Sequence, residues 1–181
     1  MIGNAFSTAA LAATGLVFAQ ALAHKLRNPG LFAHSVREYD LLPGPLALPA
    51  AAVLILAELS ALALIASAFA DLAGGLPGRL GLAAAAGLLA LYGLAMGVNL
   101  ARRKFGLDCG CTSGQTPISA GLVVRNFALA GLASAAVLVS DFRPIGLTLG
   151  VPAGVALFLA YLTTTQLMSN RMRGAAAGNS R

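Results

Sequence analysis

The chain has 181 residues, of which 58% are hydrophobic and 10% are charged, whereas about a quarter of the residues in an average soluble domain are charged. This composition excludes a water-soluble globular protein and a multi-domain enzyme with a nucleotide-binding fold. The net charge of +6 does not indicate a nucleic-acid partner, because no solvated basic surface large enough to neutralise a run of phosphates is expected. We predict an all-α, polytopic membrane helix bundle that packs through small residues in the lipid bilayer.

Charged residues divide the sequence into five apolar intervals. A membrane-spanning helix needs about 20 apolar residues, because each residue adds about 1.5 Å across a hydrocarbon core of about 30 Å. Backbone polar groups in lipid must bond within their own segment, so each interval is expected to be helical. The predicted transmembrane helices are 4–23, 46–70, 80–101, 118–140 and 145–168.

Basic residues predict how these helices are oriented. Nine of the twelve Lys and Arg residues follow the first, third or fifth interval, whereas Arg79 and Arg143 lie on the opposite side and Arg125 lies inside the fourth interval. The side richer in Lys and Arg is cytoplasmic, so the N-terminus is predicted outside and the C-terminus in the cytoplasm. We predict one transmembrane domain over residues 1–170 and a disordered basic tail over 171–181.

The first connection, residues 24–45, is the only long polar one. Its stretch 30–42 places apolar side chains at near-helical spacing among charges and ends before Pro43. This pattern predicts a short amphipathic helix on the membrane surface.

Cys109 and Cys111 are the only cysteines and are separated by a single glycine. A disulfide across so small a loop removes little chain entropy, so it is not a staple for the fold. Its geometry is expected to be strained and therefore easily reduced. The pair predicts a redox-active site, although two buried small residues without chemistry remain an alternative.

The neighbourhood of the cysteines favours the thiolate form. The basic run 102–104 precedes them, and Thr116 and Pro117 read as the N-cap and first residue of the fourth helix. Positive charge and a helix N-terminus both stabilise a thiolate, whereas Asp108 opposes it. A soft-metal site for Cu, Hg or Zn is the competing reading, because thiolates bind such metals; a closed zinc site would need further ligands such as His24 or His34.

Several polar residues fall within the predicted helices. Glu58 lies near the middle of the second helix and Arg125 near the cytoplasmic end of the fourth, where each is costly without a partner. The two are expected to meet directly or through water, with Asn126 and Asn99 adding hydrogen bonds. The alternatives are a structural pair that joins the two helices and a protonated Glu58.

At the end of the first helix, His24 is a candidate proton relay because imidazole titrates near neutrality, and Lys25 follows it. An interfacial anchor is the plainer reading of both residues. Tyr92 and Tyr161 are interpreted as packing or interface residues.

Four motifs resemble one family of membrane proteins. They are Lys25-Leu26-Arg27-Asn28-Pro29, Glu58-Leu59, Asp108-Cys109-Gly110-Cys111 and Val124-Arg125-Asn126. Together they resemble the MauE branch of the DoxX-like proteins over roughly residues 10–140. The most specific part is Cys-x-Cys followed fourteen residues later by Arg-Asn.

This resemblance implies a four-helix DoxX-like core with an added C-terminal helix, in a bacterial inner membrane. It also implies a role in methylamine utilisation, in which the protein, alongside a thioredoxin-like partner, assists processing or disulfide maturation of the methylamine dehydrogenase small subunit or of a related exported protein. Cys109 and Cys111 would be the redox thiols, and thiol–disulfide oxidoreductase activity is expected. His24, Lys25, Glu58, Arg125 and Asn126 would tune them or move protons. A quinone is a candidate cofactor; a soft-metal transport component and a non-catalytic scaffold are the rival functions.

Overall fold

The computed structural model describes residues 2–70, 75–104, 107, 117–139 and 147–178. These residues form α1 (Ile2–Arg27), α2 (Pro29–Glu38), the short 3-10 helix η1 (Gly44–Leu46), α3 (Ala47–Ala70), α4 (Gly75–Ala101), α5 (Ala120–Val139) and α6 (Leu147–Gly178). All but α2 and η1 are long and apolar enough to cross a membrane. The all-α multi-pass fold and the five predicted transmembrane helices are therefore confirmed.

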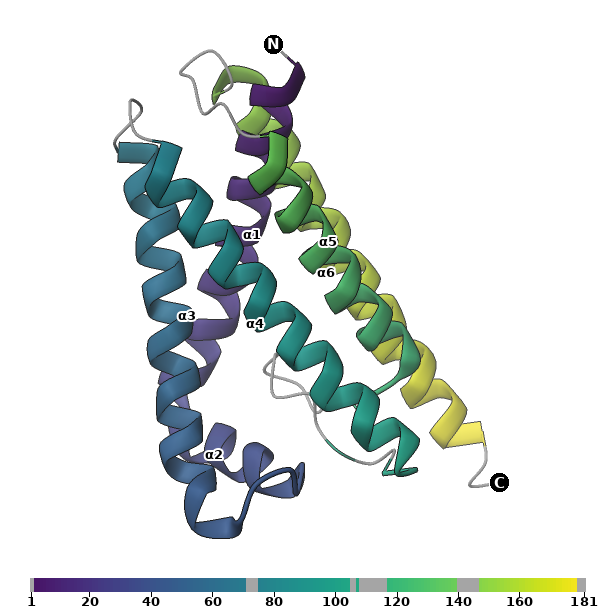
Figure 1. The fold of residues 1–181 in the computed structure, drawn as a ribbon. Coiled ribbons are helices and arrows are strands. Elements are labelled where there is room, and N and C mark those ends of the chain that lie inside the picture. The colour runs from purple at the N-terminus through teal and green to yellow at the C-terminus, as the bar shows by residue number, and fades with distance from the viewer. Residues whose placement is uncertain (1, 71–74, 105–106, 108–116, 140–146, 179–181) are drawn as a thin grey trace.

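Successive long helices run in opposite directions, as Figure 1 shows. The C-terminal ends of α1, α4 and α6 consequently lie at the same end of the bundle as α2 and the first residues of α3 and α5. We call this end of the molecule the α2 end. The predicted clustering of basic residues after the first, third and fifth helices places most of the positive charge there.

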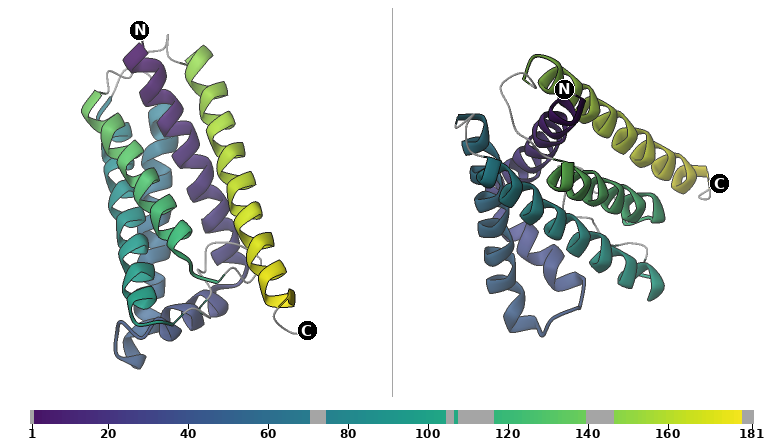
Figure 2. Two further views of the ribbon diagram at one scale, coloured as in Figure 1. Left: turned by 90° about the vertical axis from the view of Figure 1, so that its right-hand side faces the viewer. Right: turned by 45° about the horizontal axis from the view of Figure 1, so that its top comes forward.

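Helix α1 is the central element of the bundle. It contacts α3, α4, α5 and α6, and every residue from Ser7 to Gly15 is buried. Figure 2 shows α6 alongside α1, on the side away from α3 and α4. More than half of the main core cluster is alanine, so the helices approach closely through small side chains, as the composition predicted.

A proline and a left-handed residue set the limits of α2. Pro29 has no backbone N–H and disfavours a helical conformation in the residue before it, and Asn28 has φ −139° and ψ 65°. The chain turns after α2 at Asp40, whose φ is 51°. The predicted amphipathic helix is confirmed, and it ends at Glu38, before the predicted stop at Pro43.

Several helix ends differ from the sequence prediction: α1 continues to Arg27 rather than residue 23, and α4 begins at Gly75 rather than residue 80. Helix α5 begins at Ala120 rather than at Pro117, because the Ile118 N–H donates to the carbonyl of Leu107 and the Ser119 carbonyl accepts the first bonds of the helix. The prediction that Pro117 is the first residue of this helix is therefore wrong. Helix α6 continues to Gly178, past residue 170; the division into a domain and a tail stays a prediction.

Candidate functional site

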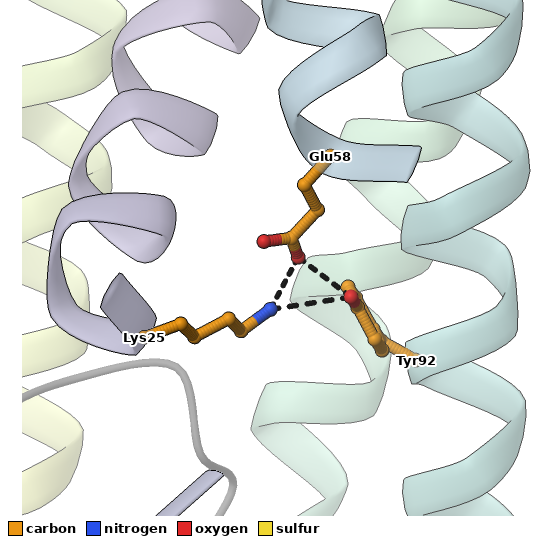
Figure 3. A network of polar contacts seen from close by, with 3 residues as sticks. All are labelled: Lys25, Glu58 and Tyr92. Carbon is orange, nitrogen blue, oxygen red and sulfur yellow. Dashed lines mark hydrogen bonds and ion pairs between the residues drawn. The ribbon is translucent and has the colours of Figure 1, made fainter. Parts of the chain in front are cut away.

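Three buried polar side chains from three helices meet inside the α2 end. The Lys25 ammonium of α1 donates to Oε1 of Glu58 on α3 and, at 3.2 Å, to the hydroxyl of Tyr92 on α4. The Tyr92 hydroxyl donates to the same Glu58 oxygen at 2.6 Å. Figure 3 shows the three side chains converging between their helices. Lys25 and Glu58 are each 1% exposed, so both charges are removed from solvent and neutralise each other.

The position of Lys25 explains why this pair forms. A lysine near the end of a membrane helix usually extends its ammonium toward water. Lys25 lies in the last turn of α1 but turns inward, because Glu58, about 17 Å along α3 by helical rise, would otherwise be an unpaired buried carboxylate. The ammonium also lies 4.4 Å from the centre of the Phe32 ring and 4.6 Å from that of Tyr92. These aromatic faces favour the buried cation further.

Arg125 is held by α6 rather than by Glu58. Its Nη1 donates to the Thr165 hydroxyl at 2.9 Å, and its guanidinium lies 4.8 Å from the centre of the Tyr161 ring. The expected direct contact between Glu58 and Arg125 is absent from the described residues, because α3 packs on α1, α2 and α4 while α5 packs on α1 and α4. Lys25 of the central helix takes the place that Arg125 was expected to fill.

Glu58 and Arg125 still face a common space. A cavity of about 20 Å³ is lined by both residues, Lys25 and Asn126 among others. Within the described part of the chain, Oε2 of Glu58 and Nε of Arg125 are buried without a hydrogen-bond partner. A cavity of this size has room for one water molecule. The meeting of Glu58 and Arg125 through water stays a prediction.

The two asparagines contribute less to this site than expected. Nδ2 of Asn126 donates to the Leu122 carbonyl at 2.8 Å, and Nδ2 of Asn99 donates to the Ala95 carbonyl at 3.1 Å. Both amides therefore bond to their own helices. Asn126 lines the small cavity, whereas Asn99 is not among the residues that line it.

A second, larger cavity lies on the other side of Lys25 and Tyr92. Its volume is about 370 Å³, and its walls come from α2, α3, α4, the connection after α2 and Lys25 of α1. Most of the lining side chains are apolar, among them Phe32, Val53, Leu91 and Met96. Lys25 and Tyr92 line both cavities, so the ion-pair cluster forms the wall between them.

Cys109 and Cys111 lie outside the described residues. Along the sequence, the nearest described residues on each side are Leu107 and Pro117. Leu107 packs on a buried cluster that contains Met96 and Ile118, and its carbonyl accepts the Ile118 N–H at 2.9 Å. The described chain on each side of the cysteine segment is thus anchored at the α2 end.

The basic run before the cysteines has a partner in the connection after α2. Lys104 lies 3.2 Å from a carboxylate oxygen of Asp40, and Arg102 donates to the Asp40 carbonyl at 3.1 Å. Asp40 is 75% exposed, so the ion pair adds little stability. Part of the positive charge that was predicted beside the cysteines is therefore bonded to Asp40.

The structure thus brings Lys25, Glu58, Arg125 and Asn126 to the lining of one small cavity. His24 is half-buried in the last turns of α1 and lines neither cavity described above. Its predicted relay role stays a prediction.

Tyr92, Tyr161 and Thr165 were missed as site residues. The two tyrosines were interpreted as packing residues, yet Tyr92 bonds to the buried ion pair and Tyr161 lies against Arg125. The sequence could have indicated the two tyrosines as site residues, because a tyrosine hydroxyl inside an apolar helix usually needs a hydrogen-bond partner. Which partner it has depends on the packing of the helices.

The fold and the site together define a multi-pass membrane protein with a neutralised ion pair buried between its helices. Comparison with known families narrows this class. The model of the family described as methylamine utilisation protein MauE matches residues 3–141. The chain belongs to this family, which confirms the predicted resemblance.

Curated relatives support the same assignment. The methylamine utilization protein MauE of Methylophilus methylotrophus is 38% identical over 121 residues, which cover 65% of this chain and 60% of the relative. That of Paracoccus denitrificans is 33% identical over 159 residues, covering 84% and 81%. That of Paracoccus versutus is 39% identical over 85 residues, covering 44% and 46%. No solved structure matches the chain.

Proposed function

We propose that this protein is a membrane component of methylamine utilisation that carries out thiol–disulfide exchange through Cys109 and Cys111. The relatives' name supports the pathway. The observation that best supports the location of the chemistry is that Leu107 and Ile118, which flank the cysteine segment, are anchored against the same end of the bundle as the buried charge cluster. The bacterial inner membrane is the proposed location, with the α2 end in the cytoplasm.

The proposed exchange moves two electrons between this chain and its partner, and it needs no other oxidant or reductant. A thiolate of the pair attacks the disulfide of a thioredoxin-like partner, which forms a mixed disulfide and releases the partner's other sulfur as a thiolate. The second cysteine then attacks the mixed disulfide. The products are a Cys109–Cys111 disulfide and a reduced partner, and the reverse sequence oxidises the partner. The methylamine dehydrogenase small subunit is the proposed final target of this exchange.

The buried residues have a supporting role in this proposal. Lys25, Glu58, Arg125 and Asn126 would tune the charge near the thiols, and His24 would relay protons. The neutralised Lys25–Glu58 pair leaves Arg125 as the cation of this group without a carboxylate partner among the described residues. We therefore expect Arg125 to have a larger effect on thiolate formation than Lys25.

Single cysteine variants test the exchange. We expect Cys109→Ser or Cys111→Ser to accumulate a mixed disulfide with a thioredoxin-fold protein whose second active-site cysteine is Ser and whose remaining cysteine carries a disulfide-linked thionitrobenzoate. The chain's remaining thiolate displaces thionitrobenzoate, and the adduct persists because no resolving thiol is present. The measurement is a non-reducing gel with mass spectrometry of the adduct, and the Cys109→Ser/Cys111→Ser chain is the matched control.

If neither single variant forms an adduct and the double variant supports growth on methylamine, the thiol proposal is wrong and a scaffold role is favoured. Stoichiometric Cu(I) or Hg(II) bound to the purified wild-type chain and lost in the double variant, without any adduct, would favour the metal alternative. Among the residues that the structure describes, no group of three or more His, Cys, Asp and Glu could hold a metal ion.

A further inference from the structure

We propose that the 370 Å³ cavity beneath α2 binds a membrane-soluble quinone, with one ring carbonyl accepting a hydrogen bond from Lys25. The cavity lies within the size range of small-molecule sites, and its mostly apolar walls with a few polar groups are typical of such sites. This binding site goes beyond the proposed thiol exchange and does not depend on it.

The position of the cavity indicates a ligand that arrives from the bilayer. Val53 of α3 and Leu91 of α4 both line it and are 63% and 49% exposed. Both lie in candidate membrane spans: Val53 is about 9 Å along α3 from Ala47 and Leu91 about 15 Å along α4 from Ala101 by helical rise. The exposed flank of the cavity is therefore in the part of the bundle that faces lipid.

The charges in the wall favour a neutral hydrogen-bond acceptor. An ammonium carries three N–H donors, and two of those on Lys25 are used by Glu58 and Tyr92. One donor remains on a residue that lines the cavity. Because Glu58 neutralises Lys25, a phosphate or carboxylate would gain little attraction and would approach the buried carboxylate, whereas an uncharged carbonyl would not be repelled.

The aromatic lining favours a flat ring over a flexible acyl chain. Phe32, Tyr39 and Tyr92 contribute rings from α2, the residue after it and α4. Aromatic side chains prefer offset-stacked or edge-to-face contact with other rings. The cavity therefore has a lipid-facing flank, one remaining N–H donor and three aromatic rings in its lining. These three features together match a ring compound with carbonyl groups.

Tyrosine fluorescence tests this binding directly. The chain has no Trp and three Tyr, and two of the tyrosines line the cavity. The full chain in an alkyl maltoside detergent would be titrated with 2,3-dimethyl-1,4-naphthoquinone, whose substituted ring positions prevent addition of a thiol. The matched compound 2,3-dimethylnaphthalene has the same ring and methyl groups without the carbonyl oxygens. We expect saturable quenching by the quinone and at least about tenfold weaker binding of the hydrocarbon, measured by competition.

Two substitutions on α3 provide a matched pair. Ala50 lines the cavity, whereas Ala52 is exposed on the same helix and does not line it. Ala50→Phe should abolish saturable quenching and Ala52→Phe should leave it unchanged. Lys25→Met combined with Glu58→Gln removes the donor without leaving a lone buried charge, and it should weaken quinone binding about tenfold.

Equal binding of the quinone and the hydrocarbon would overturn the proposal, because the Lys25 donor would then contribute nothing. Equal quenching in Ala50→Phe and Ala52→Phe would also overturn it, since the quinone would be bound elsewhere or only in the micelle. A co-purified phospholipid that is displaced by Ala50→Phe and not by the quinone would assign the cavity to an acyl chain instead.

Discussion

Lys25 and Glu58 show how a residue's role depends on its partner. Each charge alone would be expensive inside an apolar bundle, but the two are buried together, and the Tyr92 hydroxyl bonds to both. Breaking a buried ion pair by removing one member leaves an uncompensated charge, whereas removing both charges is often close to neutral. The pair is therefore best tested by comparing single and double substitutions.

We expect Lys25→Met to lower the free energy of unfolding by about 3–5 kcal/mol, because Glu58 remains buried without its cation. The Lys25→Met/Glu58→Gln chain should recover most of this loss. Reversible unfolding in mixed detergent micelles measures both values. A double variant as unstable as the single one would show that Lys25 stabilises the bundle through contacts other than the ion pair.

The sequence indicated Lys25, Glu58 and Arg125 as candidate site residues, but not how they are paired. Glu58 and Arg125 were recognisable because charges are rare within apolar helices. Their pairing could not be predicted, since it depends on which helices adjoin α1 and on which way each side chain points. The same reason explains why Tyr92 and Tyr161 were interpreted as packing residues.

At the scale of helices, glycines determine where two backbones approach most closely. A Cβ at Gly150 would lie 2.5 Å from Cβ of Thr8, and one at Gly154 would lie 2.5 Å from Cβ of Ala12. These glycines, four residues apart, place one face of α6 directly against α1. The contact matters for the site, because Thr165 and Tyr161, farther along α6, hold Arg125.

Gly154→Ala and Gly131→Ala should therefore have opposite effects. At Gly154 the added methyl group overlaps α1, so we expect a loss of about 1–3 kcal/mol in the free energy of unfolding. At Gly131 on α5 nothing lies within 4 Å of the new Cβ, so the substitution should stabilise the helix by about 0.5–1 kcal/mol. Unfolding in detergent provides the comparison. Similar values for both variants would mean that α6 does not pack tightly on α1.

At the scale of the whole molecule, alternation of helix direction gathers α2, the buried cluster and the described ends of the cysteine segment at one end. The same alternation brings most of the basic residues to that end. Positive charge on short connections favours retention in the cytoplasm, so the distribution predicts the orientation of the entire bundle.

Side-specific labelling tests this orientation. On a Cys109→Ser/Cys111→Ser background, His34→Cys places one thiol on α2 and Leu76→Cys places one at the opposite end, where the native side chains are 65% and 66% exposed. We expect a membrane-impermeant maleimide to label Leu76→Cys in intact spheroplasts and His34→Cys only in inverted vesicles. The reverse pattern would place the α2 end outside the cytoplasm.

The sequence by itself determined that the chain is surrounded by lipid and that it folds into helices. Long apolar intervals between charges predicted five membrane helices, because unpaired backbone groups are not tolerated in lipid. The tertiary structure decided that Lys25 rather than Arg125 pairs with Glu58, and that a large cavity lies beneath α2. Those features arise from contacts between residues far apart in the chain, and such contacts depend on how close-packed helices are arranged rather than on the hydrophobicity of any one segment.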